Sequence, residues 1–338
     1  MYEIDNSDLE LTPEIKAFLV SIGSVQVDLS IELPGHTTTA TAGPGAGGTS
    51  IFFKSNNRRV RLSINNKSPL YLTENENVAT ISYRGKPIVR GELEKPLYHC
   101  PKQAYITISE SCIYNCKFCP VPEIPGDVKD TDTILKMVDE AYSTGELEAV
   151  SLTSGVAESP YREVEKTTEI VKQISKRYDI PIGVSVYPTW TSTHDLFEVG
   201  ATEIKYNVET MDMSVFKKVC PDFDLRHILD SLDEAVNIFG KNRVSSNFLI
   251  GLGEDDACVK EGVTFLAKKG VIPVLRPVSP ASLQRNEISA KRPGFERLLK
   301  LSQMSKDILD KYGLRADRAK TMCVPCTGCD ITPHHDIR

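Results

Sequence analysis

The sequence predicts an α/β protein in which strands and helices alternate along residues 101–312. Six short apolar runs with strand character occur there, and each is followed by a stretch with helical periodicity. Strand–helix units in series make right-handed crossovers, so the six strands form one parallel sheet. An open doubly wound sheet and a curved partial barrel both agree with this pattern. In either, the active site lies at the carboxyl ends of the strands.

The predicted elements follow in order along the chain. The strands are residues 104–108, 149–152, 182–186, 203–208, 244–250 and 272–275. The helices are residues 131–143, 160–177, 191–198, 225–239, 257–268 and 294–312. Thr131, Thr191 and Asp224 have side chains suited to helix N-caps. The glycines expected near helix ends are Gly145, Gly200, Gly240 and Gly270.

Residues 1–100 differ from the rest, because they are rich in Thr, Ser, Asn and Gly. A short amphipathic start near residues 13–21 is followed by runs of β character at 51–54, 60–64 and 78–83. We therefore expect three parts: a β-rich N-terminal domain or extension over residues 1–100, the α/β domain over 101–312 and a C-terminal segment over 313–338. The glycine-rich stretch 43–49 lacks the spacing and the lysine of a phosphate-binding loop, so we predict a flexible loop.

Composition excludes some classes of function. The chain has 46 acidic and 40 basic residues, a formal net charge of −6, which gives no electrostatic argument for binding nucleic acid or an anionic membrane. No apolar run approaches the roughly 18 residues of a membrane-spanning helix. The acidic start Met1–Asp5 lacks the basic and apolar regions of a signal peptide. We expect a soluble cytoplasmic protein.

Clustered cysteines are the strongest chemical signal. Cytosolic cysteines in clusters usually bind metal or do chemistry, and six of the nine fall in two groups. The first group is Cys112, Cys116 and Cys119 (C-x3-C-x2-C), and the second is Cys323, Cys326 and Cys329 (C-x2-C-x2-C). The isolated cysteines are Cys100, Cys220 and Cys258.

Polar and glycine residues follow each predicted strand, where the carboxyl ends would bring them together. They are Cys112, Thr153, Ser154, Gly155, Tyr187, Asn207, Glu209, Gly251, Gly253 and Arg276. Three thiolates after the first strand cannot saturate a structural zinc ion, which takes four protein ligands. A [4Fe–4S] cluster on three thiolates leaves one iron open for an external ligand. Zinc completed by a distant residue is the alternative.

The motif Cys112-x3-Cys116-x-Phe118-Cys119 resembles the signature of the radical S-adenosylmethionine (SAM) superfamily. The resemblance implies a partial (β/α)6 TIM-type barrel and a [4Fe–4S] cluster on the three cysteines. In that family, the open iron chelates the amino and carboxyl groups of SAM, and the aromatic Phe118 would pack beside this site. One electron, from a donor such as ferredoxin or flavodoxin, cleaves SAM to methionine and a 5′-deoxyadenosyl radical.

Further motifs resemble the biotin and lipoyl synthase branch. Asn207-Val208-Glu209-Thr210 implies that Glu209 and Asn207 hold the SAM ribose, and Arg226 lies in a segment similar to the one that follows. Gly251-Leu252-Gly253-Glu254 implies an adenosine pocket shaped by Gly251 and Gly253. Thr153–Gly155 stands where the superfamily places its loop for the SAM amino group, although it departs from the usual Gly-Gly-Glu. We expect Tyr187 and Arg276 to orient substrate or the SAM carboxylate.

The second cysteine group predicts an auxiliary [4Fe–4S] cluster at the mouth of the barrel, with Pro325 and Gly328 bending the loop so that the thiolates converge. Zinc is the alternative metal. The fourth position is either open or filled by one of Cys100, Cys220, Cys258, His334 and His335. For the two histidines, a polar, mobile tail is the simpler interpretation.

An auxiliary cluster favours sulfur insertion, because biotin and lipoyl synthases take sulfur from such a cluster. The N-terminal cysteine motif of bacterial lipoyl synthases and the arginine ligand of ordinary biotin synthase are not recognisable here. The chain instead resembles the archaeal two-protein lipoyl synthases. This resemblance implies a sulfurtransferase acting on a protein-bound octanoyl chain, with an octanoylated carrier protein and a second synthase component as partners that the N-terminal domain would dock.

Two other functions remain open from the sequence. One is a radical SAM mutase, a C–C bond-forming enzyme or a methylating enzyme in cofactor or amino-acid biosynthesis. The other is a non-catalytic iron–sulfur or zinc carrier that uses the barrel as a scaffold. No Ser-His-Asp or paired-carboxylate arrangement of a hydrolase is visible in the sequence.

Overall fold

The computed structural model describes residues 9–33, 35, 37–41, 43, 45–279, 288 and 290–338. The expectation about the acidic N-terminus, residues 1–5, and Pro44 of the predicted flexible loop lie outside these residues. The described chain forms one seven-stranded sheet followed by one six-stranded sheet.

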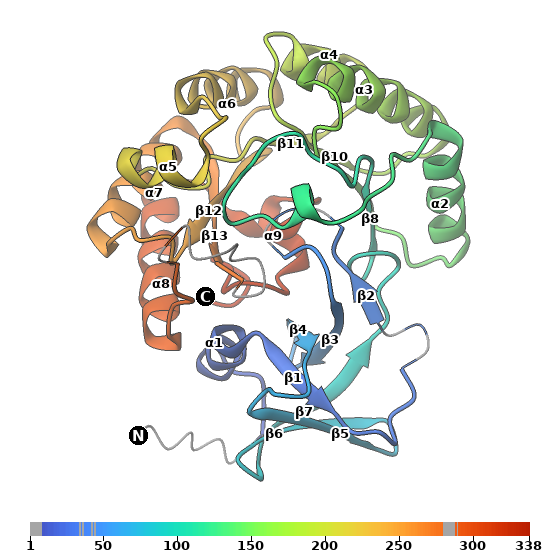
Figure 1. The fold of residues 1–338 in the computed structure, drawn as a ribbon, viewed down its shortest axis with the longest axis vertical. Coiled ribbons are helices and arrows are strands. Elements are labelled where there is room, and N and C mark those ends of the chain that lie inside the picture. Colours follow the sequence, from blue (N-terminus) through green and yellow to red (C-terminus); the bar gives the residue numbers. More distant parts are fainter. Residues whose placement is uncertain are drawn as a thin grey trace.

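The six-stranded sheet is parallel throughout and keeps the order of the sequence from edge to edge. Its strands are β8 (Gln103–Thr107), β9 (Ala149–Thr153), β10 (Ile182–Ser185), β11 (Glu203–Lys205), β12 (Val244–Ile250) and β13 (Ile272–Pro277). A doubly wound sheet reverses its strand order at a switch point, whereas here every strand neighbours the next one. The helices accordingly form an arc outside the strands (Figure 1), and the predicted partial six-stranded barrel is confirmed.

Seven helices belong to this arc, and most were predicted. They are α2 (Thr131–Ser143), α3 (Pro160–Arg177), α4 (Ser192–Glu198), α5 (Met213–Val219), α6 (Leu225–Phe239), α7 (Asp256–Lys269) and α8 (Phe295–Lys311). Asp224 caps α6 as predicted, by accepting from the backbone of Arg226 and His227. The cap of α2 is Asp130 and not Thr131, because the Asp130 carboxylate accepts from Thr133 N at 2.8 Å. Thr191 precedes α4 without a side-chain capping bond.

The N-terminal third is a small β-structure that closes on itself. Helix α1 (Pro13–Ile22) precedes seven strands, β1 (Ser24–Val27), β2 (Thr37–Thr39), β3 (Thr49–Ser55), β4 (Arg58–Ile64), β5 (Leu70–Asn75), β6 (Val78–Tyr83) and β7 (Lys86–Glu94). The sheet order is β2-β3-β4-β1-β5-β6-β7, and β3 also pairs with β7. Its core of buried apolar side chains from α1 and the strands includes Leu298 of α8 and Ile331 of the C-terminal segment. This β-structure therefore shares one core with the end of the chain.

The C-terminal segment is packed between the two sheets, so the expectation of a mobile tail is wrong. It contains a 3-10 turn at Ala316–Arg318 and a single helical turn, α9 (Cys323–Cys326), which lies in the middle of the arc (Figure 1). The buried Lys16 of α1 donates to Thr327 O and to the Asp336 carboxylate, both at 2.6 Å. His334 is buried, and its Nδ1 accepts from Ala316 N at 3.1 Å.

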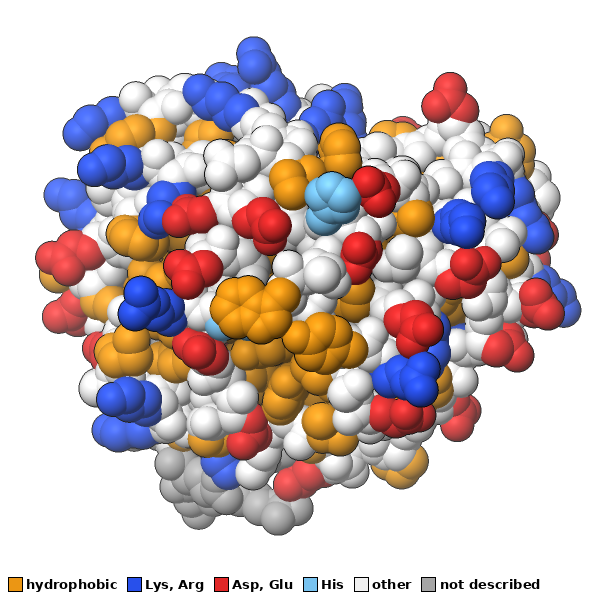
Figure 2. Space-filling view, turned by 90° about the horizontal axis from the view of Figure 1, so that it is seen from above, with side chains coloured by type: hydrophobic (Ala, Val, Ile, Leu, Met, Phe, Trp, Pro, Cys, Tyr) orange, Lys and Arg blue, Asp and Glu red, His pale blue; other side chains and the backbone are white. Residues whose placement is uncertain are grey.

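The surface mixes both signs of charge. On the face in Figure 2, acidic and basic side chains surround a group of apolar side chains near the centre. Every helix among the described residues is too short or too polar to cross a membrane.

Candidate functional site

A cavity of about 510 Å³ lies inside the six-stranded barrel. Side chains of a parallel strand alternate between its two faces, and the helices occupy the outer face. Ile106, Val186 and Pro188 line part of the cavity, but most of its barrel wall comes from alternate positions of the strands and of the residues that directly follow them. These are Tyr105, Thr107, Thr153, Ser185, Tyr187, Lys205, Asn207, Asn247 and Arg276. All of them carry a polar group, so the apolar runs that predicted the strands conceal a polar inner face.

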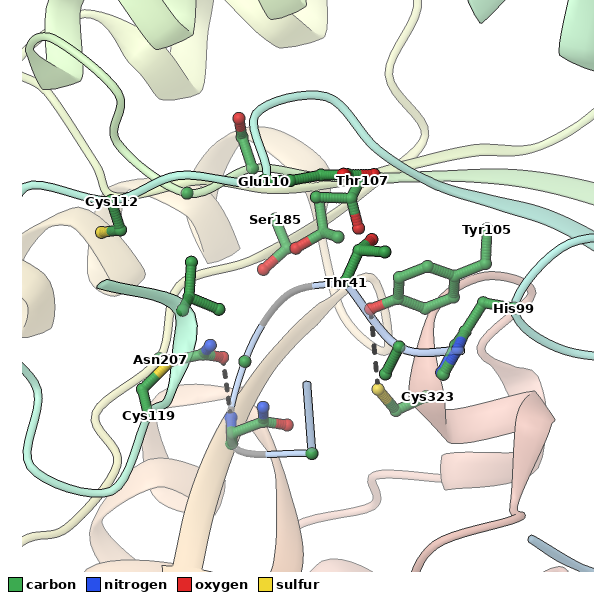
Figure 3. Close-up of a pocket in the computed structure, with 18 of the residues that line it drawn as sticks. Thr41, His99, Tyr105, Thr107, Glu110, Cys112, Cys119, Ser185, Asn207 and Cys323 are labelled. Carbon is green, nitrogen blue, oxygen red and sulfur yellow. Dashed lines mark hydrogen bonds between the residues drawn. The ribbon is translucent and has the colours of Figure 1, made fainter. Parts of the chain in front are cut away.

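The N-terminal β-structure supplies another part of the wall. Residues Thr37–Thr41 from β2 and its continuation line the cavity, together with Arg61 of β4. Figure 3 shows Thr41 among the barrel residues Tyr105, Thr107 and Ser185. The prediction that this domain docks a partner stays untested, but its first strands also form part of the site.

The loop after β8 carries the first cysteine group and is held in place by backbone bonds to the loop after β9 and to the last residue of α5. Ile113 N donates to Val156 O at 2.7 Å, and Lys117 N donates to Val219 O at 2.8 Å. Val156 N points at the Cys112 sulfur at 3.4 Å. Cys112, Cys116, Phe118 and Cys119 all line the cavity, so the motif lies at the predicted carboxyl end of the strands.

The three thiols, one buried and two partly buried, are donors that suit a cluster. Burial raises the pKa of Cys112 and Cys119, and a hydrogen bond with Cys220, followed by burial, raises that of Cys116. Cys116 acts electrostatically on Cys112, and both of them act on Cys119. Among the described residues no three His, Cys, Asp or Glu side chains are placed to hold one metal ion. A four-iron cluster binds each thiolate through a different iron, and three thiols that line one cavity are the donor set that leaves its fourth iron open.

A buried carboxylate that the sequence analysis missed organises the loop after β9. Glu163 of α3 is 2% exposed and accepts from the hydroxyls of Ser109 and Ser154, both at 2.8 Å, and from Ala157 N at 3.1 Å. Gly155 cannot carry a side chain, because an added Cβ would lie 2.2 Å from Ser111 O. Thr153, Ser154 and Gly155 line the cavity beside the cysteine loop, where the resemblance places them.

Asn207 and Glu209 face the cavity from the end of β11. Asn207 Oδ1 accepts from Asn247 N at 3.1 Å, which fixes its amide (Figure 3). Glu209 is 5% exposed, has a backbone φ of 58°, and its Oε2 has no hydrogen-bond partner in the described structure. Burial raises the pKa of this carboxyl to about 7, although Lys205 and Arg276 oppose the rise. A buried carboxylate with an unused oxygen suits a ligand that donates hydroxyl groups.

Three predicted cofactor residues do not line the cavity as the structure describes it. Arg226 is exposed on the first turn of α6. Gly251 is packed against the backbone of Lys291, whose oxygen would lie 2.2 Å from an added Cβ, and Gly253 is exposed. Glu254 folds back and accepts from Gly251 N and Leu252 N at 2.7 and 2.8 Å, so this acidic residue holds its own loop.

Aromatic side chains pack beside the cysteine loop. Tyr187 contacts Tyr114 and Phe223 with ring centroids 5.1 and 4.7 Å apart, and its hydroxyl accepts from Asp224 N at 3.2 Å. Phe118 is buried and lines the cavity. These rings give the cysteine end of the cavity an apolar wall suited to a flat ligand.

The second cysteine group reaches the cavity from the opposite end of the strands, so its predicted place at the mouth is wrong. Thr321 N and Oγ1 donate to Glu203, the first residue of β11, at 2.9 and 2.7 Å. Met322 N donates to Ser151 Oγ at 2.8 Å. The chain then turns so that Cys323 lies 3.8 Å from the Tyr105 hydroxyl and 3.6 Å from Lys205 Nζ. Figure 3 shows Cys323 with Tyr105 and His99 on one side and Cys112 and Cys119 on the other.

The predicted bend of this segment takes the form of the α9 turn. The residues before and after α9, Met322 and Thr327, both have positive φ, 64° and 55°. Of the three cysteines, Cys323 alone lines the described cavity, while Cys326 is buried behind it against Cys100. Cys220 lies instead at the first group, hydrogen-bonded to Cys116.

One family model and several solved structures are similar to this chain. Residues 106–266 match the family model of the radical SAM superfamily. No curated protein matches the sequence. The FeFe-hydrogenase maturase HydG from Carboxydothermus hydrogenoformans has a similar structure with 19% identity and a TM-score of 0.52, covering 62% of this chain and 52% of HydG.

A second HydG structure shows 17% identity and a TM-score of 0.53, covering 61% of this chain and 50% of that one. Methylornithine synthase (PylB) shows 17% identity and a TM-score of 0.47, covering 63% of this chain and 69% of PylB. The chain thus spans about half the length of the HydG proteins, and at these identities the likeness concerns the fold. The family match shows that the chain contains a radical SAM domain, which implies a [4Fe–4S] cluster and SAM.

Proposed function

We propose that this radical SAM protein inserts sulfur into an unactivated C–H bond, in the manner of lipoyl synthase. Cys112, Cys116 and Cys119 line one end of its cavity, and Cys323 brings the group that it forms with Cys326 and Cys329 to the other end. One observation carries the proposal. Cys323 and the first cysteine group line the same cavity of about 510 Å³, although they belong to segments at opposite ends of the chain. A substrate between them would be within reach of both groups.

Different residues of the first site would bind different parts of SAM. Cys112, Cys116 and Cys119 would hold the cluster, which supplies the electron that cleaves SAM into methionine and a 5′-deoxyadenosyl radical. Glu209 and Asn207 would hold the ribose, and the Thr153–Gly155 turn, braced by Glu163, would position the amino-acid part. The aromatic wall of Phe118 and Tyr187 excludes water from the reacting groups. Positioning dominates the outcome, because so reactive a radical attacks the nearest bond.

Cys323, Cys326 and Cys329 would hold a cluster that would supply sulfide to the substrate carbon and take up, at iron, the electron released as the carbon–sulfur bond forms. Lys205 and Tyr105 contact Cys323 at the floor of the cavity and hold its thiol in place. The mutase, C–C bond-forming and methylating alternatives give no reason for a second cysteine group at that floor, and a carrier gives no reason for a cavity between two such groups. The octanoyl chain as substrate, the carrier protein and the second synthase component rest on the resemblance described above.

The test is a reaction with anaerobically reconstituted protein, SAM, dithionite and an octanoylated carrier peptide. The intact protein should form 5′-deoxyadenosine and a thiolated peptide. The variant with Cys323, Cys326 and Cys329 changed to Ala should still form 5′-deoxyadenosine but no thiolated product. Iron should fall from about eight to about four per chain, as expected for two four-iron clusters. A variant with unchanged turnover of a rearranged product would favour a mutase, and absence of 5′-deoxyadenosine in the intact protein would favour a carrier.

A further inference from the structure

We propose that Cys100 is the fourth thiolate of the C-terminal iron–sulfur site, so that Cys100, Cys323, Cys326 and Cys329 together tie the N-terminal β-structure to the barrel. This inference rests on the proposed function, since it takes the auxiliary cluster as its premise. It adds a ligand from outside the C-terminal motif and closes the position that the motif leaves open.

The first argument is contact. Cys100 lies in the link between β7 and β8, its side chain is 0% exposed, and it packs with Phe52 and Cys326. Cys326 is also buried, so the two cysteines lie against each other in the interior. Two thiols buried side by side from distant parts of the sequence are suited either to a shared metal site or to a redox pair.

The second argument is that both backbones are fixed. Cys100 forms an antiparallel bridge with Gln103, the first residue of β8, and its carbonyl accepts from Leu97 N at 3.2 Å. On the other side, Cys326 O accepts from Arg59 Nη1 at 3.3 Å, and Gly328 O accepts from Arg61 N at 2.7 Å. The approach of the two residues is therefore built into the backbones of the sheet and the tail.

The third argument is charge. Lys205 Nζ lies 3.6 Å from the Cys323 sulfur, and Arg276 interacts electrostatically with Cys323 and Cys329. The Nε and Nη2 atoms of Arg61, which also lines this cavity, are buried without a hydrogen-bond partner in the described structure. Buried cations are costly unless an anion faces them. An oxidised four-iron cluster with four thiolates carries a net charge of about −2, which these cations would balance.

Three of the four other candidates for the fourth position lie elsewhere or have partners of their own. Cys220 is hydrogen-bonded to Cys116 of the first group, and Cys258 lies on α7 among acidic residues. His334 uses both ring nitrogens, with Ala316 N at 3.1 Å and the Asp310 carboxylate at 2.9 Å. His335 is the fourth: burial lowers the pKa of its ring, and its Nε2 has no hydrogen-bond partner in the described structure, but its charged neighbours are Asp336, Asp317, Lys16 and Asp330 and not the cysteines. Cys100 is the candidate in contact with the triad.

The experiment uses the full chain in a background that lacks the first site. Changing Cys112, Cys116 and Cys119 to Ala confines iron to the C-terminal site. Into this background we would introduce Cys100→Ala, the closer replacement Cys100→Ser and, as a matched control, Cys258→Ser. Each protein is reconstituted anaerobically, analysed for iron and sulfide, treated with a mild oxidant and examined by electron paramagnetic resonance. Circular dichroism checks that each variant is folded.

The background protein and the Cys258→Ser control should hold about four irons and keep them on mild oxidation, because every iron has a thiolate. Cys100→Ala should lose about one iron and develop a [3Fe–4S] signal, and Cys100→Ser should show an altered signal of the reduced cluster. Identical iron content and spectra in background and Cys100 variants would overturn the role of Cys100 alone. A background protein without iron, or with zinc in its place, would overturn the auxiliary cluster and the proposed function with it.

Discussion

At the scale of single residues, the site contains a carboxyl group that its surroundings do not satisfy. Glu209 is buried and has an unused oxygen, and its φ of 58° is an uncommon conformation for a residue with a side chain. Such strain and desolvation persist where the surrounding structure enforces them, and they are concentrated at ligand sites. The cost would be recovered when ribose hydroxyls donate to the carboxylate.

This property predicts how SAM binding depends on pH. Burial raises the pKa of Glu209 to about 7, so without ligand the carboxyl is neutral below that pH and ionised above it. The ionised form is the better acceptor from hydroxyl groups. The affinity of reconstituted protein for SAM should therefore rise with pH through about 7, as measured by equilibrium dialysis. Glu209→Gln should bind more weakly and lose this dependence; an unchanged profile in that variant would assign the titration to another group.

A second residue-scale prediction concerns Lys16. Its ammonium is 0% exposed and is satisfied by Thr327 O and the Asp336 carboxylate. Lys16→Met would leave Asp336 as a buried, uncompensated charge, a change that typically costs about 3–5 kcal/mol. We expect a decrease of that size in the free energy of unfolding, measured with denaturant on the metal-free protein.

The matched control is Lys300→Met, because Lys300 also pairs with an aspartate but is 71% exposed. It should change the free energy of unfolding by less than about 1 kcal/mol. If both variants lost the same amount, the burial of the Lys16 pair would not be the cause.

At the scale of elements, the sequence predicts the barrel better than the N-terminal domain. Helices α2, α3 and α6 have the predicted bounds, because a single apolar stripe on a polar helix is unambiguous. Helix α4 was predicted because Thr191 and Gly200 mark its two ends, whereas α5, of the same length, was missed because no glycine follows it. Strand β7 was missed because Lys86–Glu94 is charged at its ends and half-exposed, so packing and not composition decides its conformation.

In the candidate site, too, some residues could be predicted from the sequence and others could not. The motif and the rule about strand ends place Cys112, Cys116, Cys119, Asn207 and Glu209 at one cavity, because they depend on local spacing and on strand direction. Long-range packing could not be predicted in this way. Nothing in the spacing shows that the tail enters from the amino ends of the strands. The alternation of Gln103, Tyr105 and Thr107, and of Glu203, Lys205 and Asn207, was the signal that could have revealed a polar interior.

Gly183 shows how one element depends on another. This glycine of β10 leaves room for the tail, since an added Cβ would lie 2.1 Å from Thr321 Oγ1 and 2.5 Å from Thr321 Cβ. Gly183→Ala should therefore reduce the free energy of unfolding by about 1–3 kcal/mol, the usual cost of overpacking. Thr321→Gly removes the clashing atoms, so the alanine should cost less in that background. Equal costs in the two backgrounds, measured as a double-mutant cycle, would mean that the contact is not responsible.

At the scale of the whole molecule, the last residues of the chain pack between the two sheets and contact both of them. On one side they bind the barrel through Glu203 and Ser151, and on the other they bind α1 and β4 through Lys16 and Arg61. Ile331 is buried in the core of the N-terminal β-structure. The position of that β-structure over the cavity thus depends on a segment that follows the whole barrel in the sequence.

This arrangement predicts the effect of ending the chain at Lys320. The truncated protein keeps both sheets and the first cysteine group, but Lys16 loses its anion and the N-terminal core loses Ile331. We expect calorimetry of the metal-free protein to show one cooperative transition for the full chain and two for the truncated one, the first at a temperature at least about 5 °C lower. Because Thr37–Thr41 line the cavity, limited proteolysis should also cut the link between β7 and β8 faster once the β-structure is loosened. A single transition at an unchanged temperature would show that the direct contact of α1 with α8 suffices to hold the two sheets together.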